Sequence, residues 1–142
     1  MIIDGEKEAE VLRNEIKKEI NLLKEKTKKV PALSVILIGN YAPSEIYVRN
    51  KVKKSKEVGI NSDIIRYPDN VSEKEVLKKI IELNEDSKVS GILVQLPIPK
   101  QINKEKIINL IHPSKDVDGF HPVNVGNLAS GYHAITPCTP LG

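Results

Sequence analysis

Apolar and polar residues are arranged along the chain in two different patterns, one typical of helices and the other of buried strands. Over Glu6–Lys28, apolar residues recur every three or four positions among Glu and Lys residues, which predicts a helix with one apolar face. Leu33–Ile38 is instead an unbroken apolar run that ends at Gly39. Such a run is typical of a strand that is buried on both faces. The apolar face of the first helix comprises Leu12, Ile16, Ile20 and Leu23.

The same two patterns continue as far as residue 111. Ser72–Glu75 fits a capping box at the start of a helix that continues to about Asp86, and Asn103 can cap a later helix. Strands that alternate with helices in this way indicate a mostly parallel sheet. We therefore predict an α/β fold of three layers, α, β and α, as one domain over residues 1–142. The other predicted elements are a helix over Ser44–Gly59, strands over Ser62–Tyr67 and Gly91–Leu96, and a helix that buries Ile107, Ile108, Leu110 and Ile111.

The last segment, His112–Gly142, has a different composition. It is rich in Pro, Gly, Asn and Asp, and it has little periodicity beyond a short helical pattern at Val123–Ala129. A loop-rich segment of this length in a compact domain is either functional or disordered.

The predicted helix over Ser44–Gly59 has one lysine on the side where apolar residues gather. At about 100° per residue, Lys51 falls in the stripe that contains Val48 and Val52, one turn after Tyr47. The spacing leaves two interpretations open. The Lys51 amine either reaches past the edge of the stripe into water, or it points into a pocket beside Tyr47 as a reactive group.

Composition narrows the class of protein. The 142 residues suit one ordinary domain, and 39% apolar with 29% charged residues is a globular profile. The net charge is only +3, with basic and acidic residues interleaved, so we expect no nucleic-acid partner. A single cysteine, Cys138, suits a reducing compartment. Without a signal-peptide pattern or a membrane-length apolar run, we expect a cytoplasmic protein and no membrane partner.

The usual motifs for nucleotide phosphates and metals are absent from the sequence. It contains neither G-x-G-x-x-G nor G-x-x-x-x-G-K-[ST], so the loops that commonly hold nucleotide phosphates are missing. Asp116 and Asp118 are spaced as a metal pair, but no further ligand cluster accompanies them. The histidines share no metal-ligand spacing either. We therefore expect no metal site.

Three features should meet where the predicted strands end, because ligands of open parallel sheets bind beyond the carboxyl ends of the strands. The helix with Tyr47 and Lys51 follows the first strong strand. Gln95 lies at the end of the third strand, and Lys115–Gly119 opens the loop-rich segment. Gln95 either ties down neighbouring loop backbone or contacts a ligand. Asp118 is likewise either a turn former or a site residue.

Four stretches of the sequence carry a family resemblance. They are YVRNK at Tyr47–Lys51 with KEVGI after it, GILVQLPIP at Gly91–Pro99, KDVDGFHPVNVG at Lys115–Gly126, and PCTPLG at Pro137–Gly142. Each alone is weak, but together they are highly specific and extend over nearly the whole chain. The chain resembles the N-terminal, catalytic part of the bifunctional methylenetetrahydrofolate dehydrogenase/methenyltetrahydrofolate cyclohydrolases, the FolD family.

The resemblance implies two reactions on a folate. NADP-dependent hydride transfer oxidises 5,10-methylenetetrahydrofolate to the methenyl cation, which is then hydrolysed to 10-formyltetrahydrofolate. By resemblance, Lys51 is the catalytic lysine, and Tyr47 packs along the folate ring system. Gln95 hydrogen-bonds Lys51 and the reacting region, and Asp118 receives the N–H donors of the pterin. The implied substrate contacts also include Val94, Leu96 and Pro97.

The chemistry of hydrolysis is consistent with a catalytic lysine. Water adds to a cationic carbon and a C–N bond then breaks, so a group must lose and regain a proton near neutral pH. A lysine can do this where desolvation and nearby positive charge disfavour its ammonium form. We expect the apolar stripe to desolvate Lys51, with Tyr47 on the same helical face four residues earlier.

The chain departs from the family pattern in two places. In the family, the PCTPxG motif leads into a dinucleotide-binding domain, whereas this sequence ends at Gly142. We expect the NAD(P)-binding domain to be missing here, and with it the cofactor-binding residues and most contacts of the family's homodimer. The start of the second helix reads Tyr41-Ala42-Pro43-Ser44 instead of a sequence closer to D-P-A-S, a reordering that leaves Tyr47 and Lys51 in place.

Two other functions stay open from the residues. Tyr-x-x-x-Lys is also the signature of short-chain dehydrogenases. These require a glycine-rich nucleotide loop upstream of the pair, and Leu33–Gly39 is followed by none. The second alternative is a non-catalytic folate- or pterin-binding module, which composition does not distinguish from part of an enzyme.

Overall fold

The computed structural model describes residues 4–138 of the 142-residue chain. As far as residue 110, helices and strands alternate in the predicted order. In chain order, the elements are α1 (Gly5–Thr27), β1 (Ala32–Ile38), α2 (Ala42–Val58), β2 (Asn61–Tyr67), α3 (Glu73–Glu85), β3 (Gly91–Val94), α4 (Lys104–Leu110), the 3-10 helix η1 (Pro113–Lys115) and α5 (Pro122–Ala129).

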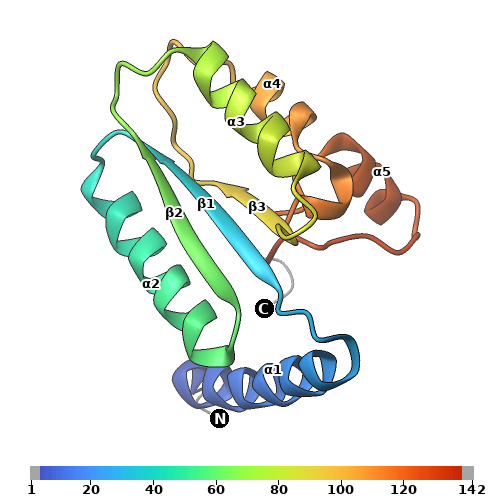
Figure 1. Ribbon diagram of the computed structural model, residues 1–142. Coiled ribbons are helices and arrows are strands. Elements are labelled where there is room, and N and C mark those ends of the chain that lie inside the picture. Colours follow the sequence, from blue (N-terminus) through green and yellow to red (C-terminus); the bar gives the residue numbers. More distant parts are fainter. Residues whose placement is uncertain (1–3, 139–142) are drawn as a thin grey trace.

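The sheet of the described residues has three strands in the order β2-β1-β3, and both pairings are parallel. The helix α2 lies over one face of this sheet, and α3 and α4 lie over the other (Figure 1). The predicted three-layer α/β fold is therefore confirmed. The central strand β1 packs against α2 on one face and against α3 and α4 on the other.

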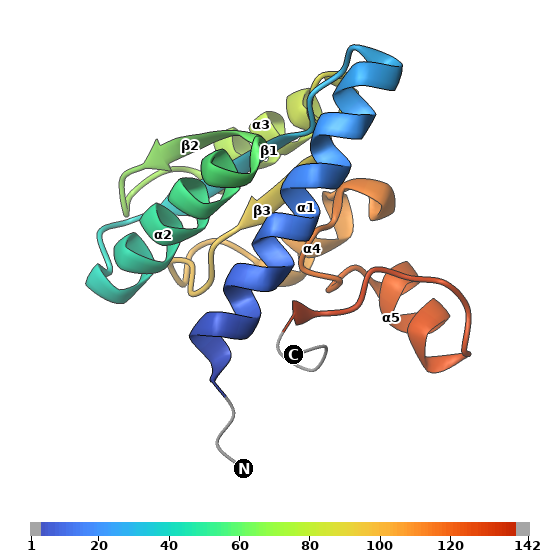
Figure 2. The same cartoon turned by 90° about the horizontal axis from the view of Figure 1, so that it is seen from below.

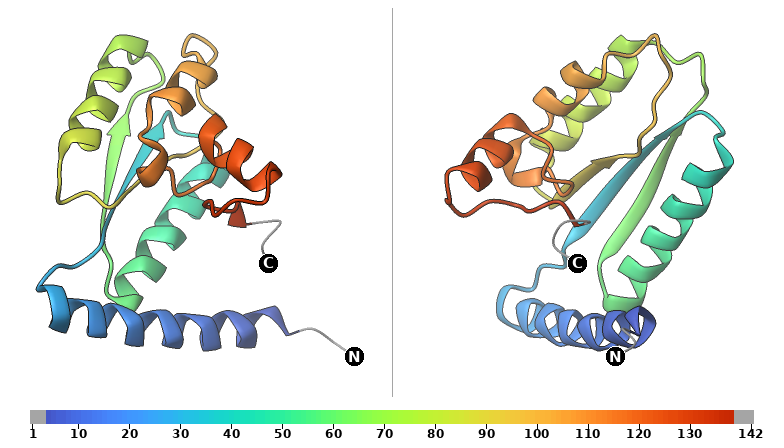
Figure 3. Two further views of the ribbon diagram at one scale, coloured as in Figure 1. Left: turned by 90° about the vertical axis from the view of Figure 1, so that its right-hand side faces the viewer. Right: turned by 180° about the vertical axis from the view of Figure 1, so that it is seen from behind.

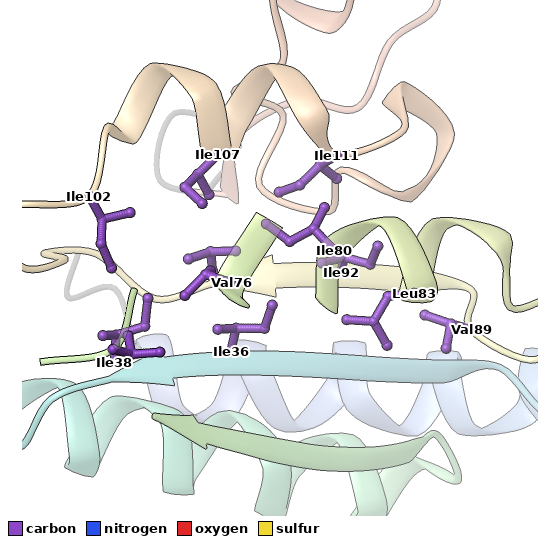
Figure 4. Close-up of a cluster of buried hydrophobic side chains, with 12 residues drawn as sticks. Ile36, Ile38, Val76, Ile80, Leu83, Val89, Ile92, Ile102, Ile107 and Ile111 are labelled. Atoms are coloured by element: carbon purple, nitrogen blue, oxygen red, sulfur yellow. The ribbon is translucent and has the colours of Figure 1, made fainter. Parts of the chain in front are cut away.

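The central strand β1 divides the core into two clusters, since neighbouring residues of a strand point to opposite faces. Ile36 and Ile38 belong to the larger cluster, which α3 and α4 cover (Figure 4). Val35 and Leu37 point the other way and pack with residues of α2, including Val48. Burying an apolar side chain of this size contributes about 1.5–3 kcal/mol relative to exposure. The unbroken apolar run in the sequence therefore holds both outer layers to the sheet.

The helix ends follow signals in the sequence. The C-cap of α2 is Gly59, whose φ of 97° lies in the left-handed region, as expected for a C-cap glycine. The side chains of Ser72 and Asn103 accept hydrogen bonds from the N–H groups of Glu75 and Lys106. They therefore cap α3 and α4 as predicted.

The first helix, α1, lies across the ends of the strands rather than over a face of the sheet (Figure 3). In the view from below, it passes between α2 and α5 (Figure 2). Ile20 is buried near Gly59, whereas Leu12 and Leu23 are 56% and 42% exposed. The predicted helix is confirmed, but much of its apolar face stays exposed because α1 meets its neighbours mainly near Ile20.

The strand β3 is shorter than predicted, and the loop-rich segment after α4 is built onto it. β3 ends at Val94 rather than at Leu96, although the N–H of Gln95 still donates to Ile36 O at 2.9 Å. Beyond η1, Asp116 makes a single parallel bridge with Ile92. α5 lies within one residue of the predicted range 123–129. Residues 139–142, which belong to the PCTPLG motif, lie outside the described part of the chain.

Replacing Gly59 tests the left-handed end of α2. Gly59→Ala should lower the free energy of unfolding by about 1–2 kcal/mol, because a Cβ is strained at positive φ. Gly5→Ala is the matched control, since a Cβ at Gly5 meets no atom within 4 Å. Urea unfolding of both variants measures the difference, and equal stability of the two would contradict this prediction.

Candidate functional site

A cleft of about 900 Å³ lies on the α2 side of the sheet, next to β3. Helix α2 borders it on one side, and the chain after η1 borders it on the other. The cleft was expected at the carboxyl ends of the strands. Gln95 is at such an end, but the cleft also extends along the sheet to Leu33 near the start of β1. Its lining residues are Leu33, Lys51, Lys54, Ser55, Leu93, Gln95, Leu96, Val117, Asp118, Phe120, Pro137 and Cys138.

Lys51 reaches the cleft from α2. Its Nζ donates a hydrogen bond to Gln95 Oε1 at 3.4 Å, which is long for such a bond. The expectation that the apolar stripe desolvates Lys51 is wrong, because Lys51 is exposed. Val48 and Val52 of the same stripe are buried against the sheet. Lys51 lies instead where the stripe meets the cleft.

Tyr47 precedes Lys51 by one helical turn, as the spacing requires. Its side chain is 62% exposed, and it does not line the cleft. The sequence pattern placed Tyr47 in the apolar stripe, but it lies at the solvent edge of that stripe. A ligand that lies in the cleft and extends past its edge can reach both side chains from the same side of α2.

Gln95 ties down neighbouring loop backbone, which is one of the two interpretations of its sequence position; the ligand contact stays a prediction. Its Nε2 donates to the carbonyl oxygen of Leu96 at 2.7 Å, which ties down the backbone after β3. Its Oε1 faces Lys51, and its own N–H pairs with Ile36. The side-chain amide is therefore held in one orientation, with the carbonyl oxygen turned toward the lysine.

The loop after η1 is anchored by Lys115, which sequence reasoning did not single out. The Nζ of Lys115 donates to three carbonyl oxygens at the end of α3, each at 2.8 Å. Carbonyls at a helix end have no partner within the helix, so an ammonium group there satisfies several at once. No spacing signal marks such a lysine, because its partners are about thirty residues away. The three oxygens belong to Leu83, Asn84 and Asp86.

The two aspartates of this loop have different surroundings. Asp116 is only 4% exposed, and its Oδ2 accepts hydrogen bonds from the N–H of His121 at 2.8 Å and from Asn124 Nδ2 at 3.0 Å. It therefore holds the start of α5, a structural role. Asp118 instead lines the cleft, opposite α2. The Asp-Gly turn expected here is present, with Gly119 at a φ of 69°.

Burial raises the pKa of the Asp118 carboxyl above its ordinary value, while the charge of Lys51 lowers it and that of Asp116 raises it. Burial is the largest of these effects. A partly desolvated carboxylate gains more from ligand N–H donors than a fully hydrated one does. Asp118 is therefore suited to bind a ligand that presents such donors.

The predicted substrate contacts around Gln95 lie on different sides of the strand. Leu96 lines the cleft. Val94 is buried in the cluster between the sheet and the helices α3 and α4, so its side chain faces away from the cleft. Pro97 is exposed and is not among the lining residues.

Apart from Leu96, the apolar residues of the cleft were not predicted as site residues. Leu33 and Leu93 lie on the α2 face of their strands, and Val117 and Phe120 flank Asp118 in the loop. Alternation along a strand would have placed Leu93 on the same face as Gln95. The positions of the two loop residues have no such signal.

The described residues contain neither a cluster of metal ligands nor a helix that could span a membrane. Within residues 4–138, no group of three or more His, Cys, Asp or Glu side chains is arranged to hold a metal ion. No helix of that range has the length and apolar character needed to cross a membrane.

Sequence comparison adds to this geometry. Residues 3–118 match the family model described as the catalytic domain of tetrahydrofolate dehydrogenase/cyclohydrolase. The chain belongs to this family. The matched region of this tetrahydrofolate dehydrogenase/cyclohydrolase domain includes Tyr47 and the cleft residues Lys51, Gln95 and Asp118.

Three similar proteins are each about twice as long as this chain. The chain is 60% identical to the bifunctional protein FolD of Pelagibacter ubique over its whole length, which is 50% of that protein. It superposes on FolD of Campylobacter jejuni with a TM-score of 0.93 and 43% identity, over 97% of this chain and 49% of that one. For the Trypanosoma brucei dehydrogenase-cyclohydrolase, solved with NADP and an inhibitor, the TM-score is 0.93 and the identity 36%, over 98% and 48% of the chains. The chain thus spans about half the length of these relatives.

Asp118→Asn should stabilise the folded domain at neutral pH. Because folding raises the pKa of Asp118, the folded domain holds this proton more tightly than the unfolded chain, and its stability falls as the pH rises above the ordinary value of 3.8. Asparagine does not titrate, so the stability of the variant lacks this pH dependence. In denaturant unfolding, the variant should match the unsubstituted protein below the ordinary pKa and exceed its stability near neutral pH. An advantage that grows toward low pH would contradict this.

Proposed function

We propose that this domain binds the folate substrate of an enzyme that oxidises 5,10-methylenetetrahydrofolate and hydrolyses the methenyl product to 10-formyltetrahydrofolate. The observation that carries the proposal is the convergence of Lys51, Gln95 and Asp118 on one cleft from α2, β3 and the loop after η1. The names of the relatives, bifunctional FolD proteins with dehydrogenase and cyclohydrolase activities, support it.

Asp118 is the group we assign to the pterin. A carboxylate can accept two N–H donors side by side, which gives a charge-assisted and directional contact. Burial raises the pKa of Asp118, so donors from a ligand would stabilise its charged form. Leu33, Leu93 and Phe120 supply apolar surface in the same cleft. Aromatic rings of a ligand can bury area against them.

Lys51 and Gln95 are the groups we assign to the reacting carbon. Hydrolysis adds water to that carbon and later breaks a C–N bond. One proton must leave the water, and one must reach the departing nitrogen. The Nζ of Lys51 can accept and return a proton when its ammonium form is disfavoured. Gln95 Oε1, 3.4 Å away, orients the amine.

The desolvation that this chemistry needs must come from outside α2. Lys51 is exposed, so its own helix does not exclude water from it. A bound folate that packs across Tyr47 would cover Lys51, and the cationic methenyl carbon would disfavour a second positive charge nearby. In this proposal the substrate itself activates the lysine.

Hydride transfer is proposed for the whole protein, with NADP as the acceptor. The Trypanosoma brucei relative was solved in complex with NADP. The residues present here do not fit the cofactor's phosphates, because the sequence lacks a glycine-rich phosphate loop. A separate dinucleotide-binding domain, a homodimer formed largely by it and a cytoplasmic location are parts of the same proposal.

In the whole protein, Lys51→Ala should lower the cyclohydrolase kcat by at least 100-fold, the usual scale for losing a group that moves protons. Lys53→Ala is the matched control, because Lys53 is exposed on the same helix and does not line the cleft. Hydrolysis of methenyltetrahydrofolate, followed by absorbance, measures both variants. Retained turnover by Lys51→Ala would contradict the role assigned to this lysine.

A binding measurement separates this proposal from a non-catalytic pterin-binding module. Calorimetry of residues 1–142 with a folate analogue should give binding that Asp118→Asn weakens about tenfold or more, since hydrogen bonds to charged groups contribute about 1.5–3 kcal/mol. A parallel cyclohydrolase assay then asks whether the bound substrate turns over. Binding without turnover, in both this domain and the whole protein, would favour the non-catalytic module.

A further inference from the structure

Gly91, the first residue of β3, lies directly beneath the loop that carries Asp118. A Cβ added at Gly91 would lie 2.4 Å from Val117 Cγ1 and 3.6 Å from Leu33 Cδ1. Real Cβ atoms essentially never show a contact as short as 2.4 Å, so either the strand at Gly91 or the side chain of Val117 would have to move. Gly91 is not among the glycines with positive φ. Its lack of a side chain therefore matters because of this contact and not because of its backbone conformation.

The position of Gly91 in β3 connects it to the cleft. Residues at every second position of a strand share one face, so Gly91, Leu93 and Gln95 all face α2. Leu93 and Gln95 line the cleft. Val117, which lies against Gly91, also lines it and is covalently next to Asp118.

The rest of the loop has little freedom to absorb a displacement of Val117. On one side, Asp116 is bridged to Ile92 and bonded to the N–H of His121. On the other, a Cβ at Gly119 would lie 2.6 Å from Ile135 O, so the chain is tightly packed there as well. A shift of Val117 would therefore be passed to Asp118.

We propose that Gly91 is a positioning residue of the folate site: its missing side chain seats Val117 on the sheet and thereby places the Asp118 carboxylate across the cleft from Lys51. This inference rests on the proposed function. Gly91 itself touches no substrate in this assignment. Its role is carried by Val117, which a Cβ would displace.

A double-mutant cycle in the whole protein tests this role. Gly91→Ala should raise the KM for methenyltetrahydrofolate about tenfold, the loss expected when about 1.4 kcal/mol of binding is removed, with a smaller effect on kcat. Val117→Ala removes the atom that clashes, so the double variant Gly91→Ala/Val117→Ala should recover most of the KM. Gly5→Ala, where a Cβ meets nothing within 4 Å, should leave KM unchanged.

The outcomes separate a positioning role from a structural one. If the unsubstituted protein is active and Gly91→Ala has the same KM, the inference is overturned. A loss that the double variant fails to recover also overturns it, since such a loss would reflect the fold and not this contact. If Gly91→Ala does not fold in a thermal melt, Val117→Ile enlarges the same contact by one methylene, and an unchanged KM there overturns the inference. An unsubstituted protein without cyclohydrolase activity counts instead against the proposed function.

Discussion

The parallel pairing of β1 with β3 is the constraint on which the site depends. It continues past the last residue of β3 to the hydrogen bond from the Gln95 N–H to Ile36 O, so Gln95 is held as firmly as a strand residue. Alternation along β3 then turns Leu93 and Gln95 toward α2 and Val94 toward α3. One register therefore decides which residues can meet a ligand. It also explains why Val94, although part of the same motif, belongs to the core.

The loop after η1 divides structural and chemical work between neighbouring residues. The charged groups of Lys115 and Asp116 form hydrogen bonds within the protein, at the end of α3 and the start of α5 respectively. Asp118, two residues on, faces the cleft with a carboxyl whose pKa is raised by burial. Buried charges need partners, and a rigid loop is what allows one carboxylate to be left for a ligand.

Lys51 is less enclosed than its place in the helix pattern indicates. A stripe that is apolar on average buries its centre, at Val48 and Val52, and leaves its edge at the surface. Lys51 and Tyr47 both lie at that edge, where a ligand can reach them. The same arrangement that keeps them accessible leaves the lysine hydrated, so its chemistry depends on what covers it.

The sequence by itself determined the order of the elements, the caps of α3 and α4 at Ser72 and Asn103, and the burial of β1, because these follow from local spacing and local hydrogen bonds. It also determined the family, since the motifs around Lys51 and Gln95 are specific in combination. Only the tertiary structure decided the features that depend on contacts between segments far apart in the chain. These are the exposure of Lys51, the length of β3, the partners of Lys115 and the contact of Val117 with Gly91. The physical reason is that burial and hydrogen bonding across such distances depend on packing, which periodicity does not encode.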